Sequence, residues 1–279
     1  MSSVAIITAR GGSKRIPKKN IKDFCGKPII AYSIEAALNA ECFDEIMVST
    51  DSREIAETAV RYGAKVPFMR SEKTSNDFAA TADVIKEVLE EYEKLGKSFE
   101  WLCCIYPTAP FLKGEVLNHS MAEADRLGAE SLLPVVRYGY PPKRGFVIQD
   151  GYLKYLYPEN ERVRSQDLEP EYHDAGQFYV CRTDAFRKSG TLVMEHTVPL
   201  ILKEEDVQDI DTMEDWHMAE LKYVYKRYKE NFKEENVMNK ILTAISGGYY
   251  RAAILPQLTL SFYKKSPDRW GSSYRVPAR

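Results

Sequence analysis

Short apolar runs alternate along the chain with longer segments whose apolar residues recur every three or four positions. Residues 4–8 form the first run, and their β-branched character is typical of a strand buried in a parallel sheet. The first longer segment covers residues 28–38 and predicts an amphipathic helix with Ile30, Ile34 and Ala37 on its apolar face. The pattern predicts further strands over 45–50, 66–69, 101–106, 131–137, 176–181 and 198–202, and further helices over 81–95, 114–127 and 211–231.

Strands and helices that alternate at this length predict βαβ units. We therefore expect an α/β fold, a Rossmann-like and mostly parallel sheet with helices on both faces. Residues 138–172 interrupt the alternation with the sequence Tyr-Pro-Pro-Lys-Arg and with an alternating segment around Asp150-Gly151. Because an Asp-Gly pair suits a tight β-hairpin, we interpret this range as an arm inserted into a domain over residues 1–232.

Residues 233–279 have no clean period and end in a segment rich in Ser, Pro and Arg, so they form a separate C-terminal extension. An appended segment, a disordered tail and an artificial addition all fit such a sequence. From residue 236 onward the chain carries seven Lys or Arg against one Asp, which leaves the rest with a net charge of −8. The overall charge of −2 argues against a general nucleic-acid binder. Because residues 1–235 are acidic overall, they need a local group of cations if they are to bind a polyphosphate.

The five cysteines form no C-x-x-C pair and no zinc-like spacing with the four histidines. An odd count without a disulfide framework is typical of a reducing compartment. The N-terminus lacks the charged and apolar regions of a signal peptide, and no apolar stretch approaches about 18 residues. These features predict a soluble, cytoplasmic protein.

A glycine-rich, basic loop directly follows the first strand. Its eleven residues, Arg10 to Asn20, have the sequence Arg-Gly-Gly-Ser-Lys-Arg-Ile-Pro-Lys-Lys-Asn with five cations. Glycine lets backbone N–H groups approach an anion closely, and cations neutralise its charge. The Walker pattern and the G-x-G-x-x-G dinucleotide pattern are both absent, which disfavours a hydride-transferring enzyme. A solvated basic turn is the simpler alternative, but five cations after a buried strand favour a phosphate site.

The loop offers cations and backbone amides to a polyphosphate, and Asn20 adds a donor and an acceptor for ribose or phosphate. The candidate nucleotide-binding groups of the loop are Arg10, Gly11, Gly12, Ser13, Lys14, Lys19 and Asn20. Asp51 follows the second strand and has Glu54 three residues later, so we expect Asp51 to cap the next helix.

Asp209 and Asp211 lie two residues apart, just before the last predicted helix. Side chains at this spacing project to one side of an extended segment, so both carboxylates can face one Mg²⁺. The alternative is helix capping by Asp211, with Glu214 completing a capping box. The aspartate pair alone favours capping, whereas its combination with the phosphate loop favours a metal site.

The loop sequence resembles the N-terminal signature of the acylneuraminate cytidylyltransferases. The resemblance continues in order through Phe-Cys-Gly-Lys-Pro-Ile-Ile at 24–30, Val-Ser-Thr-Asp at 48–51, Val-Pro-Phe-Met-Arg at 66–70, Tyr-Pro-Thr-Ala-Pro at 106–110 and Asp-Ile-Asp at 209–211. It covers residues 4 to about 232. The fold that it implies is of the nucleotide-diphospho-sugar transferase type.

The resemblance implies attack by the anomeric hydroxyl of a nine-carbon sugar acid on the α-phosphorus of CTP, with pyrophosphate leaving and Mg²⁺ required. Catalysis by positioning and charge would then involve Arg10, Lys14, Lys19 and Asp211. By resemblance alone, Arg70 and Ser75 hold the base, while Thr108 and Gln177 lie on the sugar side. The family also implies a homodimer in which the arm reaches the partner's site.

Tyr106 stands where the sialate enzymes usually carry Gln before the Pro-Thr pair. Together with Cys103-Cys104-Ile105 and with Asp-Ala-Gly-Gln-Phe-Tyr at 174–179, it is similar to the branch that activates pseudaminic acid. An aromatic residue that ends an apolar strand is also commonly part of the core.

Two other hypotheses remain open. A cytidylyltransferase for N-acetylneuraminate or for a deoxy-octulosonate shares the loop and the aspartate pair. Only the sugar site distinguishes such an enzyme from one that activates pseudaminic acid. A catalytically silent nucleotide-binding module is disfavoured, because such a domain has no need of the aspartate pair. A related magnesium phosphatase is excluded, because Thr-Ala-Arg-Gly-Gly follows the first strand in place of an aspartyl nucleophile motif.

Overall fold

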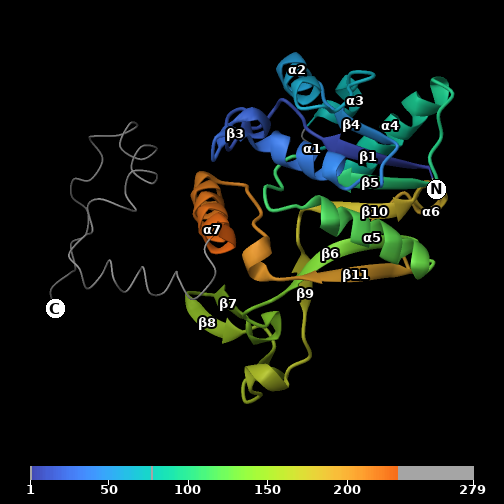
Figure 1. Cartoon of the computed structure of the whole chain (residues 1–279). Helices are drawn as coiled ribbons and strands as arrows, with labels where there is room; N and C mark the ends of the chain where they lie inside the picture. Colours follow the sequence, from blue (N-terminus) through green and yellow to red (C-terminus); the bar gives the residue numbers. More distant parts are fainter. Residues whose placement is uncertain (1, 77, 232–279) are drawn as a thin grey trace, which may run out of the picture. The chain divides into compact units, whose positions relative to one another are not determined.

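The computed structural model describes residues 2–76 and 78–231, and the chain divides into two compact units, 1–224 and 225–279. The first unit is built on a seven-stranded sheet with the order β11-β6-β10-β5-β1-β4, and β9 also pairs with β6 (Figure 1). The strands are β1 (Ser3–Thr8), β4 (Glu45–Ser49), β5 (Trp101–Ile105), β6 (Ser131–Arg137), β9 (Tyr172–Asp174), β10 (Phe178–Arg182) and β11 (Thr197–Leu202). The predicted extension beyond residue 232 lies outside the described residues.

The sheet is mixed but mostly parallel. β1 pairs in parallel with both β4 and β5, and β11 pairs in parallel with β6. β10 is antiparallel to both of its neighbours, and β9 is antiparallel to β6. The α/β class and the mostly parallel sheet are therefore confirmed, with two antiparallel strands as the exception.

Helices cover both faces of the sheet because successive strand residues point to opposite sides. In β1, Ala5 and Ile7 pack into one core cluster with α1 and α5, whereas Val4 and Ile6 pack into another with α4 and α6. Figure 1 shows α1 and α5 side by side on one face. The helices are α1 (Ile29–Asn39), α2 (Arg53–Arg61), α3 (Glu72–Ser75), α4 (Thr81–Lys94), α5 (Gly114–Arg126), α6 (Thr183–Ser189) and α7 (Met213–Asn231).

Two local predictions were wrong. Residues 66–69 form no strand, and only Lys65 bridges to Met47 of β4. The reason is Pro67, which has no N–H to donate to a strand ladder. The N-cap of α2 is Ser52, whose hydroxyl accepts from the Ile55 amide, so Asp51 does not cap this helix. The short strands β2 (Asp23–Phe24) and β3 (Lys27–Pro28) were not predicted.

The range 138–172 contains the predicted hairpin. Its strands are β7 (Phe146–Gln149) and β8 (Tyr152–Tyr155), and they pair antiparallel. Asp150 and Gly151 between them have φ values of 55° and 82°, as the tightest hairpin turns require. β9 then brings the chain back to the main sheet beside β6.

Among the described glycines in the helices that cover the sheet, Gly114 is expected to be the least tolerant of an added side chain. A Cβ atom there would lie 2.6 Å from the backbone carbon of Asn39 and 2.7 Å from the nitrogen of Ala40, at the end of α1. Alanine normally stabilises a helix relative to glycine, but here Gly114→Ala should lower the free energy of unfolding by about 1–3 kcal/mol through overpacking. Urea denaturation measures this change.

The matched control is Asn118→Ala, on the exposed side of the same helix. It should stay within about 0.5 kcal/mol of the parent protein. A Gly114→Ala protein that is as stable as the parent would show that α1 and α5 can move apart at no cost.

Within the described residues, no helix is both long enough and apolar enough to span a membrane. Cys103, Cys104 and Cys181 are thiols buried in the core.

Candidate functional site

The predicted site residues gather where the parallel strands β1, β4 and β5 end. The phosphate loop follows β1, and the amide of Ala9, just before the loop, donates to the carbonyl of Ser49 at the end of β4. After β5, the amide of Tyr106 donates to the carbonyl of Gln177 at 2.8 Å, because antiparallel β10 begins at this edge. In open α/β sheets, ligands bind outside the carboxyl ends of the strands. The topology therefore makes this edge the candidate site.

The loop is held in shape by contacts of its own residues. The side-chain amide of Asn20, which is buried, donates to the carbonyl of Arg10 at 2.9 Å. The amide of Ser13 donates to the carbonyl of Gly11, and the amide of Gly11 donates to the Asp51 carboxylate at 2.7 Å. Asn20 thus uses one of its two side-chain N–H groups inside the loop, and two of the three predicted backbone donors already have acceptors.

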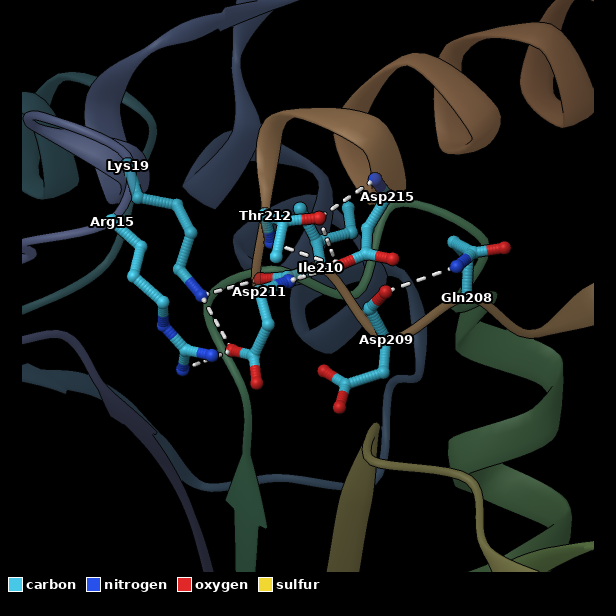
Figure 2. A network of polar contacts seen from close by, with 8 residues as sticks. All are labelled: Arg15, Lys19, Gln208, Asp209, Ile210, Asp211, Thr212 and Asp215. Atoms are coloured by element: carbon cyan, nitrogen blue, oxygen red, sulfur yellow. Dashed lines mark hydrogen bonds and ion pairs between the residues drawn. The ribbon is translucent and has the colours of Figure 1, made fainter. Parts of the chain in front are cut away.

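Lys19 connects the loop to the aspartate pair, although the two segments are far apart in sequence. Its ammonium donates to the carbonyl of Ile210 at 2.5 Å and lies 3.6 Å from the carboxylate of Asp211. Arg15 approaches the same Asp211 oxygen at 3.0 Å (Figure 2). The Lys19 side chain is only 20% exposed, whereas that of Arg15 is 65% exposed. The phosphate loop and the aspartate pair therefore belong to one site.

A third core cluster positions both partners of this contact. Ile16 of the loop and Ile210 between the two aspartates are both buried in it, together with Phe24 and Trp216. The Phe24 and Trp216 rings pack edge to face with centroids 5.4 Å apart. Since Ile210 is fully buried, its neighbours Asp209 and Asp211 leave the backbone on the opposite side, as Figure 2 shows.

The start of α7 is capped by Thr212 and Asp215, and not by Asp211 with Glu214. The Asp215 carboxylate accepts from the Thr212 amide at 2.8 Å and from the Asp211 amide at 3.1 Å, while the Asp215 amide donates to the Thr212 hydroxyl. This is a capping box shifted by one residue from the alternative considered above. The Asp211 carboxylate is therefore not used as a helix cap.

The donor set fits a magnesium ion. Partial burial and the nearby Asp211 carboxylate both raise the pKa of Asp209, and Lys19 opposes them. Two carboxylates that repel each other in this way are stabilised by a cation between them. The described residues contain no group of three His, Cys, Asp or Glu side chains placed to hold a metal. A cation bound by this pair would complete its coordination with water and phosphate oxygens, as Mg²⁺ does.

Arg70 lies beside the loop and is 8% exposed. Its guanidinium donates to the hydroxyl and to the carbonyl of Ser49, at 3.0 and 2.7 Å. Ser75 lies at the end of α3, where its hydroxyl donates to the carbonyl of Ser71. Arg70 therefore reaches the strand ends, whereas the Ser75 hydroxyl makes a hydrogen bond within the first turn of its own helix.

Tyr106 is partly buried against Tyr179, with ring centroids 5.7 Å apart. Burial raises the pKa of Tyr106, and its hydroxyl also contacts those of Tyr179 and Thr81. Gln177 is buried and donates its side-chain amide to the carbonyl of Asp206. Thr108 is partly exposed on the turn after β5. These residues share the strand-end edge with the loop, although Gln177 is engaged in holding the segment before Asp209.

Comparison with known proteins agrees with this geometry. A family model described as cytidylyltransferase matches residues 4–137. Over 80% of this chain and 97% of the relative, the sequence is 40% identical to the pseudaminic acid cytidylyltransferase of Campylobacter jejuni. The chain belongs to the cytidylyltransferase family.

The chain is also similar, at lower identity, to a second relative and to a solved structure. The CMP-N,N'-diacetyllegionaminic acid synthase of Legionella pneumophila is 35% identical over 79% of this chain and 95% of its own length. Among solved structures, CMP:2-keto-3-deoxy-manno-octonic acid synthetase complexed with CTP has a TM-score of 0.61 at 16% identity, over 81% of this chain and all of that one. At that identity, the likeness shows only the fold.

In this cytidylyltransferase, sequence reasoning missed three groups at the site. Arg15 was counted among the loop cations without a role, yet it pairs with Asp211. Asp51 binds the loop. The Tyr179 hydroxyl donates to the carboxylate of Asp174, which also accepts from the Gly176 amide at 2.7 Å. The capping box of α7 could have been found in the sequence from the pattern Thr-x-x-Asp at 212–215. The contacts of Arg15 and Asp51 could not, because they join segments that are distant in sequence.

Proposed function

We propose that this enzyme transfers CMP from CTP to the anomeric hydroxyl of a nonulosonic acid, with pseudaminic acid as the favoured substrate. The observation that carries the proposal is the contact of Lys19 with Ile210 and Asp211, since it joins a phosphate loop to a carboxylate pair. The hydroxyl oxygen forms a bond to the α-phosphorus as the bond between that phosphorus and the bridging oxygen breaks. The hydroxyl proton is lost and pyrophosphate leaves.

The nucleotide is proposed to lie along the loop. Arg10, Lys14 and Lys19 would neutralise the triphosphate, and the backbone of Gly11, Gly12 and Ser13 would lie against it. Of the three backbone amides, that of Gly12 suits a hydrogen bond to a phosphate oxygen best, since those of Gly11 and Ser13 already have acceptors. Asn20 would act by holding the loop closed at the Arg10 carbonyl. Arg70 and Ser75 are proposed on the base side, where a buried guanidinium is well placed to donate to a cytosine ring.

The metal is proposed to be Mg²⁺ held by Asp209 and Asp211. When bound, it would supply positive charge to the phosphate oxygens on which negative charge develops. Lys19 would hold the Asp211 carboxylate in place, because its ammonium is itself fixed by the Ile210 carbonyl. Arg15 would balance the charge of the same carboxylate.

The test of this function is pyrophosphate release with CTP against a panel of nonulosonic acids. We expect turnover with CTP and pseudaminic acid, and little with UTP or ATP. Turnover that is highest with N-acetylneuraminate or a deoxy-octulosonate would assign the alternative sugar within the same reaction. Binding of CTP without turnover of any sugar acid would favour a silent nucleotide-binding module.

Tyr106→Gln is expected to lower kcat/KM for pseudaminic acid by roughly a hundredfold while changing KM for CTP far less. An aromatic ring suits a sugar with a methyl-bearing, less hydroxylated tail, whereas an amide suits one rich in hydroxyls. Tyr106, Thr108 and Gln177 are the proposed sugar-side residues. Steady-state kinetics with pseudaminic acid and with N-acetylneuraminate measure the change in kcat/KM.

Tyr106→Phe is the matched control, because it keeps the ring and removes only the hydroxyl that contacts Tyr179 and Thr81. It should retain the preference for pseudaminic acid. Unchanged sugar selectivity in Tyr106→Gln would show that this ring belongs only to the core.

A homodimer built through the arm is proposed on the basis of its exposed apolar surface. Ile148 and Tyr152 of the hairpin are 79% and 73% exposed, and Leu153 beside them is also exposed. An isolated two-stranded hairpin is at best marginally stable in water, so such a surface is better explained by a second copy that covers it.

The buried thiols support a place in the reducing cytoplasm.

A further inference from the structure

The carboxylate of Asp51 follows β4 at the strand-end edge, where it contacts the phosphate loop and acts electrostatically on Arg70. Its Oδ1 accepts from the Gly11 amide at 2.7 Å. A Cβ atom on Gly11 would lie 3.1 Å from the Cβ of Ser52 and 3.6 Å from the same Asp51 oxygen. The first turn of the loop therefore rests directly on residues 51 and 52, and glycine permits that approach.

This contact changes the role of the Gly11 amide. A backbone amide has a single hydrogen to donate, and that of Gly11 is given to Asp51. The Asp51 carboxylate therefore accepts the hydrogen bond from the Gly11 amide that we had predicted for a phosphate oxygen. The Gly11 contact thus sets the position of the loop, and the remaining groups are left to meet the nucleotide.

The same carboxylate balances a buried cation. Burial lowers the pKa of the Arg70 guanidinium, and the largest opposing influence is Asp51, followed by Glu87. Arg10 lies near enough to lower the pKa of Arg70 further. Two cations that approach one region repel each other, and a buried charge is costly without a partner. Asp51 and Glu87 are thus the negative charges that oppose the effect of burial on Arg70, and Asp51 also holds the loop.

We infer that Asp51 is a positioning residue that couples the phosphate loop to Arg70 and thereby fixes the two ends of the CTP site relative to each other. The inference rests on the proposed function, in which the loop holds the triphosphate and Arg70 lies on the base side. Asp51 touches no reacting atom in this scheme. Its loss should therefore weaken CTP binding more than it slows turnover at saturating CTP.

Isothermal calorimetry with CTP and steady-state kinetics test the inference on the full chain. Asp51→Ala removes both the acceptor and the charge, and should weaken CTP binding roughly ten- to a hundredfold, with the effect in KM and little change in kcat. Asp51→Asn keeps an acceptor for Gly11 but not the charge. It should recover part of the lost affinity, and it serves as the test variant if Asp51→Ala does not fold.

Ser52→Ala is the matched control. Ser52 caps α2 through the Ile55 amide, so its loss destabilises the same turn without removing the carboxylate. It should leave CTP affinity within about twofold of the parent, because helix caps act on stability. Equal weakening by Ser52→Ala and Asp51→Ala would overturn the inference, since the effect would then be general loosening of the turn.

Two further outcomes separate this inference from the proposed function. Tight CTP binding by the wild-type protein that Asp51→Ala leaves unchanged overturns the inference alone. A wild-type protein that binds no CTP overturns the proposed function together with the inference.

Discussion

Asp211→Asn is expected to lower kcat by two orders of magnitude or more, since charge stabilisation of this kind contributes roughly 10²–10³-fold at a single group. Asparagine keeps the shape of the side chain but removes the charge that is proposed to hold Mg²⁺ and that pairs with Arg15 and Lys19. Pyrophosphate release at saturating CTP and Mg²⁺ measures the loss. Thermal unfolding should change little, because the cap of α7 is made by Thr212 and Asp215.

Glu214→Gln is the control for Asp211→Asn. Glu214 lies in the first turn of α7, and its replacement removes a neighbouring negative charge of equal size. It should leave kcat within about twofold, because surface charges away from the reacting atoms have small effects. An Asp211→Asn enzyme that remains fully active at low Mg²⁺ would contradict a metal site at this carboxylate.

Lys19→Ala is expected to lower kcat/KM for CTP by roughly a hundredfold or more. The residue would contact the triphosphate and also orders the aspartate pair through the Ile210 carbonyl. Because Lys19 is largely buried, the substitution should also cost about 1.5–3 kcal/mol of unfolding free energy, as charged hydrogen bonds do. From the sequence alone we would expect an exposed cation with almost no effect on stability.

Lys18→Ala is the matched control, one residue earlier in the same loop. Its ammonium pairs with Glu54 on the surface, at 2.7 Å. Surface pairs contribute at most about 1 kcal/mol, so this variant should keep nearly full activity and stability. If Lys18→Ala and Lys19→Ala reduced CTP use equally, the loss would reflect the total charge of the loop and not a particular position.

Strands and helices with a clear period could be predicted, because their apolar spacing records which side faces the core. Ser131–Arg137 agrees residue for residue with the predicted strand, and Thr81–Lys94 differs from the predicted helix by one residue. The segment at 66–69 was wrong because Pro67 outweighs its apolar neighbours. In the same way, the cap of α7 depends on competition between adjacent polar residues, which residue type alone does not decide.

The site was harder to predict than the fold, because its contacts join distant segments. Arg10, Lys19 and Asp211 could be named from local sequence, but the Gly11–Asp51 bond and the burial of Ile210 beside Ile16 depend on how strands and helices pack. Asp51 was assigned to the helix after it because a D-x-x-E pattern fits a cap. The strand order, which sets β1 beside β4, instead gives its carboxylate to the loop.

The contact of Lys19 with Ile210 spans 191 positions of the chain. During synthesis the phosphate loop is among the first segments to emerge, and its acidic partner is among the last of the described domain. Contacts of such long range form late, because the chain between them must already be ordered. A chain cut short before residue 209 would hold all the described strands of the sheet and the whole basic loop, but not the carboxylates opposite it. The site would thus be complete only after the segment around residue 211 has been made and has folded against the loop.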